Sequence, residues 1–165
     1  MKKIGLLSDT HGYLDPKIFD YFKDVDEIWH AGDVGDTSVI KALEEFKPTQ
    51  GVYGNIDGHE VRSFWPEHLF FTCEDKKVLI SHIGGKPYKY RPNSYSKIKL
   101  HQPDIFVCGH SHILLVQYDK NISALWLNPG ACGKKGFHKV STILRFEIDG
   151  DKIQNMEVIE LNTRV

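Results

Sequence analysis

Short apolar runs that end in glycine or a polar residue recur along this chain of 165 residues and limit how it can fold. Three of them, at residues 4–7, 27–29 and 51–53, are separated by stretches whose apolar residues have helical spacing. The first of these stretches begins near Pro16 and the second near Asp36. Short buried strands that alternate with helices are typical of a parallel sheet covered by helices. We therefore predict a β-α-β-α-β order for roughly the first 55 residues.

The second half of the chain has the pattern of hairpins. The strands predicted there are residues 69–73, 77–81, 105–107, 115–118, 122–127, 140–148 and 152–161, and a helix is predicted near residues 94–101. Turn residues separate most of these strands, which favours antiparallel pairing. Apolar side chains alternate along residues 140–148, with Ile143 as the exception. We predict an α/β (α+β) fold of two packed sheets flanked by helices, in a single domain over residues 1–165.

Charge and composition argue against several classes of protein. Lys and Arg total 21 against 22 Asp and Glu, so no basic excess is available for stable nucleic-acid binding. No apolar run approaches the ~18 residues of a membrane helix, and the run after the basic N-terminus is too short for a signal peptide. Three scattered cysteines favour a reducing compartment. We expect a cytoplasmic protein that does not bind membranes.

Two stretches keep alternative interpretations. Residues 86–99 combine basic and tyrosine side chains, and form either a solvated loop, which we favour, or a surface that guides an anionic substrate. The aromatic residues within 64–65 and 69–71 belong either to the core or to a subunit interface. A homo-oligomer therefore remains open.

Potential metal ligands follow five of the predicted strands within a few residues. They are Asp9, His11, Asp33, Asn55, His82, His110 and His112. In open α/β sheets, ligands bind beyond the carboxyl ends of the strands, so residues far apart in sequence can meet in one cleft. Glycines at positions 32, 54 and 109 allow tight turns beside these residues.

The donor types in this set favour two divalent transition-metal ions. All seven residues offer oxygen or imidazole nitrogen, and none offers a thiolate. We expect Mn²⁺ first, with Zn, Fe, Ni or Co as alternatives. One carboxylate shared by two ions gives eight donor positions, about four for each ion. A hydroxide that bridges the ions would then attack the phosphorus of a phosphate ester. Each residue taken alone is an ordinary turn, cap or surface residue, and only the ordered set points to a site.

The ordered set also resembles a known family. Asp9-Thr10-His11, Gly32-Asp33, Gly54-Asn55, His82 and Gly109-His110-Ser111-His112 resemble the signature of the calcineurin-like metallophosphoesterases. The short chain and Gly-Asn-Ile-Asp at 54–57 resemble the small single-domain phosphodiesterase branch of bacteria and archaea.

This resemblance implies a site and a fold. It implies that Asp9, His11 and His112 bind one metal ion. It implies that Asn55, His82 and His110 bind the other, with Asp33 bridging the two. The fold implied is a four-layer α/β/β/α sandwich of two mixed β-sheets.

Position 56 departs from the family pattern. Many members have a histidine there that protonates the leaving group, whereas this chain has Ile56. A general acid typically contributes ~10²–10⁴-fold to the rate, so we expect a phosphodiesterase rather than a monoesterase. His59 is the substitute acid to consider, although a solvated loop histidine is the simpler interpretation. Asp57 is either a turn residue or a carboxylate that orients a histidine ligand.

The predicted function is hydrolysis of a phosphate ester whose identity the sequence does not reveal. Asp33, Asn55 and His82, with His59 as the least supported member, are the residues expected to act in catalysis. Nucleotides, cyclic nucleotides, nucleic-acid ends and lipid-derived diesters all remain open as substrates. The alternative is a binding scaffold with the same fold and little or no activity, as in a eukaryotic membrane-trafficking subunit that has lost several of the ligands.

Overall fold

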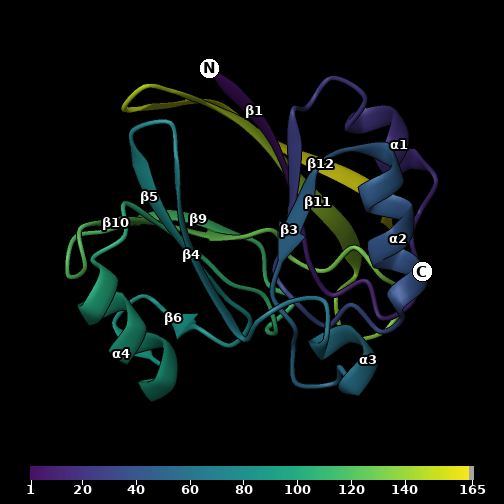
Figure 1. Cartoon of the computed structure of the whole chain (residues 1–165), viewed down its shortest axis with the longest axis horizontal. Coiled ribbons are helices and arrows are strands. Elements are labelled where there is room, and N and C mark those ends of the chain that lie inside the picture. Colours follow the sequence, from purple (N-terminus) through teal and green to yellow (C-terminus); the bar gives the residue numbers. More distant parts are fainter. Residues whose placement is uncertain (164–165) are drawn as a thin grey trace.

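A computed structural model describes residues 1–163 and shows two five-stranded sheets packed face to face (Figure 1). The order is β12-β11-β1-β2-β3 in the first sheet and β4-β5-β8-β10-β9 in the second. The elements are β1 (Lys2–Leu7), α1 (Lys17–Tyr21), β2 (Glu27–His30), α2 (Thr37–Phe46), β3 (Thr49–Gly51), α3 (His59–Arg62), β4 (His68–Cys73), β5 (Lys76–Ser81), β6 (Gly85–Lys86), β7 (Lys89–Tyr90), α4 (Pro92–His101), β8 (Ile105–Val107), β9 (Leu115–Asp119), β10 (Ala124–Asn128), β11 (Val140–Asp149) and β12 (Lys152–Thr163).

The first sheet contains the predicted parallel strands β1, β2 and β3. The third strand covers Thr49–Gly51 instead of the predicted residues 51–53. The amide of Val52 still donates to His30 O of β2 at 3.1 Å, but the next amide on that side, that of Gly54, donates to Asp57 Oδ2 at 2.8 Å, so the ladder ends there. On the other side of β1 the long strands β11 and β12 add antiparallel pairs. The first sheet is therefore built from both ends of the chain.

Helices α1 and α2 cover the outer face of the first sheet (Figure 1). The apolar residues predicted to share one face of α2, such as Ile40 and Leu43, are fully buried in this layer. Asp36 caps the helix by accepting a hydrogen bond from the amide of Ser38, at 2.8 Å. Ile143, the exception to the alternation in β11, packs in the same layer. It faces the helices, while its alternating neighbours face the second sheet.

The second sheet is mixed. Strands β4 and β5 form the predicted antiparallel hairpin, but β5, β8 and β10 are parallel to one another. Helix α4 lies between β5 and β8 in the chain and makes the crossover that parallel neighbours require. Its Ile98 packs with Phe106 and Trp126 on the outer face of this sheet. The chain thus has the four-layer α/β/β/α sandwich that the sequence predicts.

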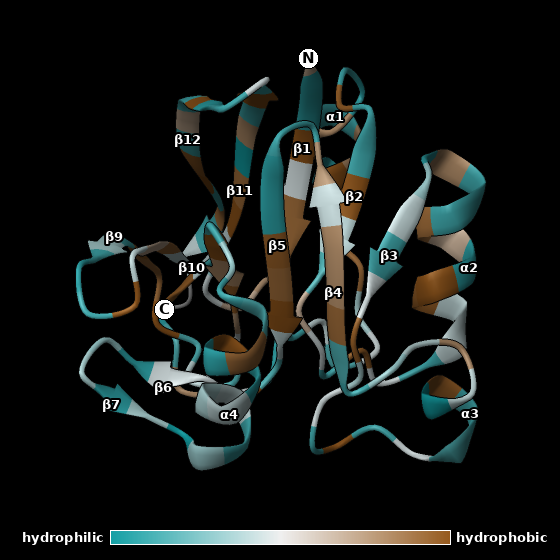
Figure 2. Cartoon of the chain, turned by 60° about the vertical axis from the view of Figure 1, so that its left-hand side comes forward, coloured by the Kyte–Doolittle hydropathy of each residue, from teal (hydrophilic) through white to brown (hydrophobic). Residues whose placement is uncertain are grey.

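The main core lies between the two sheets. Leu144, Phe146 and Ile148 of β11 meet Val78 and Ile80 of β5 there, all with no exposed surface. Figure 2 shows that hydrophobic segments gather on the central strands, whereas α2 carries hydrophobic and hydrophilic bands in turn. The two sheets are held together because the apolar side chains on their facing sides are buried away from water.

The sequence does not predict three short elements. Helix α3 has four residues, and β6 and β7 have two residues each, which is too short to show a periodicity.

The favoured interpretation of residues 86–99 as a solvated loop is wrong over most of its length, because β7 and α4 occupy it. Tyr90 stacks on Tyr95, with ring centroids 4.7 Å apart, and packs on Trp126.

The aromatic residues at 64–71 divide between core and surface. Trp65 is buried, and Phe71 contacts Trp29 with ring centroids 5.2 Å apart. Phe64 and Phe70 are exposed, and Phe70 stacks on His101.

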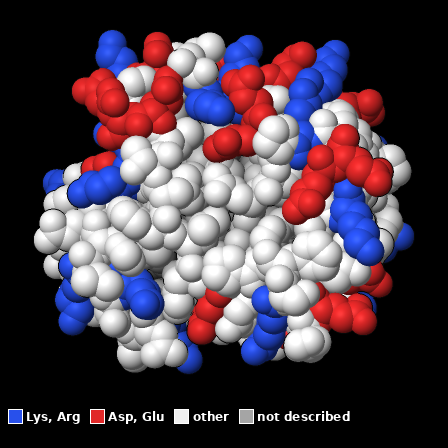
Figure 3. Space-filling model, in the orientation of Figure 1, with Lys and Arg blue, Asp and Glu red and all other residues white. Residues whose placement is uncertain are grey.

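Figure 3 shows acidic and basic side chains intermixed around the edge of one face, whose central area is largely uncharged. Within residues 1–163, no helix is long and apolar enough to span a membrane.

Candidate metal centre

The seven predicted ligands lie on loops that leave the carboxyl ends of β1, β2, β3, β5 and β8. Backbone hydrogen bonds join these loops to one another. The amide of Asp9 donates to Gly32 O at 2.9 Å, and the amide of His11 donates to Asp33 O at 3.0 Å. The amide of Gly109 donates to His82 O at 3.0 Å. Both sheets therefore contribute side chains to one place.

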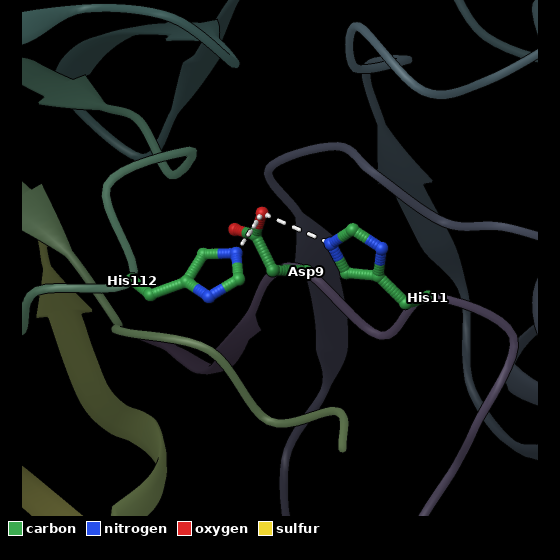
Figure 4. A group of neighbouring side chains, drawn as sticks. All are labelled: Asp9, His11 and His112. Atoms are coloured by element: carbon green, nitrogen blue, oxygen red, sulfur yellow. Dashed lines mark hydrogen bonds and ion pairs between the residues drawn. The ribbon is translucent and has the colours of Figure 1, made fainter. Parts of the chain in front are cut away.

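Asp9, His11 and His112 form the first group (Figure 4). The carboxylate of Asp9 lies between the two imidazole rings, with Oδ1 3.1 Å from His112 Nε2 and 3.8 Å from His11 Nε2. Asp9 is fully buried, whereas the two histidines are partly exposed. One potential ligand atom from each residue lies within 4.8 Å of the other two, close enough to hold a single ion.

Asp33, His82 and His110 form the second group. Asp33 Oδ2 lies 3.2 Å from His82 Nε2, and both residues are buried. The same oxygen lies 3.5 Å from His11 Nε2, so Asp33 stands between the two groups. Asn55 joins the second group through its Oδ1, which is 3.0 Å from His110 Nδ1. All seven predicted residues are thus brought together.

The protonation of His82 shows what this arrangement needs. Its Nδ1 lies 2.7 Å from Ala31 O, and a carbonyl oxygen can only accept, so Nδ1 carries the hydrogen. In the neutral ring Nε2 then presents a lone pair toward the carboxylate of Asp33. Two acceptors 3.2 Å apart repel each other unless a proton or a metal cation lies between them.

Two buried imidazole nitrogens without a hydrogen-bond partner indicate that a metal cation belongs in the centre. In the described part of the chain, His11 Nε2 and His82 Nε2 are buried and have no hydrogen-bond partner. Such atoms normally bind a protein group, water or an ion. Together with the oxygen and nitrogen donor set, this observation fits two divalent transition-metal ions.

The charges in the site support one another. Burial alone would raise the pKa of Asp9, but the His11 and His112 rings hold it below its ordinary value. Asp9 in turn raises the pKa of His11. Burial lowers the pKa of His82, yet the Asp33 and Asp9 carboxylates outweigh that effect and raise it. The buried carboxylates thus make the centre attractive to positive charge.

His138 is a residue of the site that sequence reasoning missed. Its Nε2 lies 2.8 Å from Gly133 O, so Nε2 carries the hydrogen and Nδ1 is an acceptor. His112 Nδ1, 3.2 Å away, donates to it. That leaves His112 Nε2 without a hydrogen and directed at Asp9. His138 lies in a loop between β10 and β11, and no periodicity or motif in that loop marks it.

Asp57 fixes the loops that carry the second group. Its carboxylate accepts hydrogen bonds from the amides of Val34 at 3.0 Å, Gly35 at 2.8 Å and Gly54 at 2.8 Å. These amides belong to the loops after β2 and β3, which bear Asp33 and Asn55. Of the two interpretations of Asp57, the structural turn residue matches these contacts, and no hydrogen bond within residues 1–163 joins it to a histidine.

The backbone of the centre is conformationally strained. Five of the seven residues have positive φ values: Asp9 (56°), His11 (47°), Asp33 (53°), His110 (67°) and His112 (62°). Side chains rarely adopt this region, and such residues concentrate at functional sites. Gly54 has a different constraint, because a Cβ there would collide with the carboxylate and amide of Asp33.

Neither Ile56 nor His59 joins the seven residues. Ile56 is 47% exposed, although its amide donates to Asp33 Oδ1 at 3.1 Å. His59 begins α3 and is exposed, and no hydrogen bond or ion pair in the described chain connects its ring to the groups above. His30 is fully buried beneath the site, where Nε2 bonds Thr10 Oγ1 at 3.1 Å, in line with a structural role.

Comparisons with known proteins agree with this arrangement. The family model described as the calcineurin-like phosphoesterase superfamily domain matches residues 1–151. A "Probable metallophosphoesterase" of Methanothermobacter thermautotrophicus is 29% identical over 98% of this chain and 94% of its own. A "Phosphodiesterase" of Methanocaldococcus jannaschii is 27% identical over 79% of this chain and 84% of its own.

Two solved structures share the fold. One is reported as a novel archaeal phosphodiesterase, with a TM-score of 0.77 at 24% identity over 96% of this chain and 99% of the other. The second is Vps29 from Chaetomium thermophilum, with a TM-score of 0.77 at 15% identity over the whole of both chains.

Proposed function

Because the chain belongs to the calcineurin-like phosphoesterase superfamily, we propose that it is a metal-dependent phosphoesterase that prefers diesters to monoesters. The observation that carries this proposal is the meeting of two His/Asp groups at Asp33. Asp9, His11 and His112 would hold one ion, and His82, His110 and Asn55 the other, with Asp33 shared. Two such ions, when bound, supply Lewis-acid stabilisation of phosphoryl oxygens and lower the pKa of a water nucleophile.

The protein's own residues provide orientation and charge. The carbonyl oxygen of Ala31 sets the tautomer of His82. The carbonyl oxygen of Gly133 sets the tautomer of His112 through His138. Asp57 holds the loops of Asp33 and Asn55 in place. A ligand set fixed before substrate binds needs no reorganisation during the reaction.

The residue next to Asn55 supports the diester preference. An exposed isoleucine at position 56 cannot donate a proton to a leaving group. A leaving group of low pKa needs no such donor, whereas an alkoxide expelled from an unactivated monoester does. The phosphodiesterase name of one relative points the same way.

Metal analysis combined with kinetics tests the proposal. Purified protein reconstituted with Mn²⁺ is expected to bind two ions per chain and to hydrolyse bis(p-nitrophenyl) phosphate faster than an unactivated alkyl phosphomonoester such as glycerol 1-phosphate. Ni²⁺, Zn²⁺ and Co²⁺ would be compared in parallel. Asp33→Asn should lower kcat/KM by at least about 10², since this carboxylate would serve both ions. Asp24→Asn removes an exposed carboxylate outside the site and is the matched control.

The alternative function is a binding scaffold with the same fold and little or no activity. It predicts no tightly bound pair of ions, no hydrolysis of either ester and no effect of Asp33→Asn. That set of results would overturn the proposal. Faster hydrolysis of the monoester with two bound ions would overturn only the diester preference.

A further inference from the structure

A cavity of about 560 Å³ opens beside the second group of the centre. Asn55 and His82 belong to that group and also line the cavity. Its volume lies within the range of small-molecule sites. If a substrate phosphate lies at the metal centre, as the proposed function requires, one of its ester arms can enter this space.

Two arginines line the cavity without a carboxylate partner. Within residues 1–163, neither Arg62 nor Arg91 forms an ion pair. Arg62 Nε donates to Asp57 O at 2.8 Å, and its guanidinium lies 4.3 Å from the centroid of the Tyr53 ring. The amide of Arg91 donates to Gly84 O, but its side chain has no hydrogen bond in the described chain. Guanidinium groups left unpaired beside a cavity suit a phosphate, which they bind through two hydrogen bonds.

The cavity keeps a net positive charge, because its lining contains two arginines and one carboxylate. Glu67 is the one carboxylate among the lining residues, and it lies 3.7 Å from His68 Nε2 and 3.3 Å from Tyr53 Oη. The first turn of α4, at Pro92–Ser94, also lines the cavity, and its cap position has no side-chain hydrogen bond. A helix N-terminus carries partial positive charge.

We propose that this cavity is a subsite for a second phosphate group. The substrate would then be a phosphodiester with an additional phosphate on one arm, recognised by Arg62 and Arg91. Two guanidinium groups match the charge of a phosphate better than that of a carboxylate. This proposal rests on the phosphoesterase function and adds the substrate class. It also agrees with the second interpretation of the basic stretch at residues 86–99, which contains Arg91.

The test compares two substrates that differ by one phosphate. They are the p-nitrophenyl esters of thymidine 5′-phosphate with and without a 3′-phosphate, used as probes with Mn²⁺-loaded full-length protein. Wild-type protein should prefer the 3′-phosphorylated ester by about tenfold in kcat/KM, the gain from one charge-assisted hydrogen bond. Arg91→Gln and Arg62→Gln should each reduce that ratio toward one. Lys99→Gln removes a positive charge from α4 outside the cavity and should keep the wild-type ratio.

A binding measurement separates this proposal from the proposed function. Thymidine 3′-phosphate and thymidine would be titrated calorimetrically into EDTA-treated protein, where no hydrolysis is required. Thymidine 3′-phosphate should bind wild type about tenfold more tightly than thymidine does, with the difference reduced in Arg91→Gln. Equal affinities, or a difference that survives both arginine substitutions, would overturn the subsite. Absence of hydrolysis with both esters would instead count against the phosphoesterase function, and the titration would still decide the subsite.

Discussion

His138 determines which nitrogen of His112 is available to a metal ion. The chain of hydrogen bonds from Gly133 O through His138 leaves His112 Nε2 without a hydrogen. His138→Ala should therefore weaken metal affinity by about 10–100-fold, as loss of such supporting partners typically does. Titration with a chelating metal indicator measures this. His138→Gln keeps a side-chain acceptor and should restore most of the affinity, whereas an unchanged affinity in His138→Ala would refute the role.

His30 should make the metal-free protein less stable in mild acid. Burial lowers its pKa to about 4, while the unfolded chain titrates near 6.5. The amide of Gly32 donates to Nδ1 at 3.0 Å, so an added proton has no acceptor there. The folded state thus binds fewer protons than the unfolded state between these values, and stability rises with pH across them.

The size of this effect can be measured against a variant. Lowering the pH from 6.5 to 5 should reduce the free energy of unfolding of wild type by about 2 kcal/mol more than that of His30→Gln. Urea unfolding in EDTA at both pH values gives the comparison. A glutamine at position 30 does not titrate, so equal losses in the two proteins would show that another group is responsible.

At the scale of elements, the loops after β2 and β3 depend on one buried carboxylate. Asp57→Asn replaces one acceptor oxygen of the carboxylate by an NH₂ group. The N–H donors of that group would then face the amides of Val34, Gly35 and Gly54, which are donors themselves. Loss of these charge-assisted hydrogen bonds should lower the free energy of unfolding by about 3 kcal/mol. Metal affinity should fall as well, because Asp33 and Asn55 move with the loops. Unfolding in EDTA separates the two effects.

A matched substitution is available at the start of α2. Asp36 also accepts a backbone hydrogen bond through its side chain, but at an exposed cap where asparagine serves equally well. Asp36→Asn should therefore change stability little. A similar response of both variants would contradict the particular role of Asp57.

Elements with a clear periodicity could be predicted from the sequence, and those without one could not. The alternation of apolar residues identifies β11, and the spacing of apolar residues identifies α2. The position of Ile143 as an exception to the alternation is also visible in the sequence, and this residue packs in the layer of the helices. Helix α3 and the β6–β7 hairpin are too short to carry a pattern. The pairing of β11 with β1 depends on contacts across the whole chain, and no local signal specifies it.

At the scale of the molecule, the candidate centre was predictable because its residues follow strands. Parallel strands place their carboxyl ends together, so Asp9, Asp33 and Asn55, which follow β1, β2 and β3, could be expected to meet. Their positive φ values and the support from His138 could not be expected, since both arise from how loops pack in three dimensions. The cavity with Arg62 and Arg91 was unpredictable for the same reason, because α3 and α4 bring the two arginines to it from separate parts of the chain.

Metal binding should join the two sheets. Asp9, His11 and Asp33 follow strands of the first sheet, whereas His82, His110 and His112 follow strands of the second. Each of the two groups contains residues from both sheets, so an ion bound in either group would bind the folded chain far better than the unfolded one. Removal of the metal should therefore destabilise the whole sandwich and not only the loops.

The expected loss follows from the linkage of binding to folding. At a free metal concentration 100 times Kd, one site contributes about 2.7 kcal/mol, which corresponds to roughly 5–10 °C in Tm for a chain of this size. Scanning calorimetry in Mn²⁺ and in EDTA measures the difference. Asp33→Asn should show a smaller shift, because it lacks the carboxylate common to both groups, while Asp24→Asn should match wild type. Equal Tm values with and without metal in wild-type protein would mean that the two sheets are not joined through this centre.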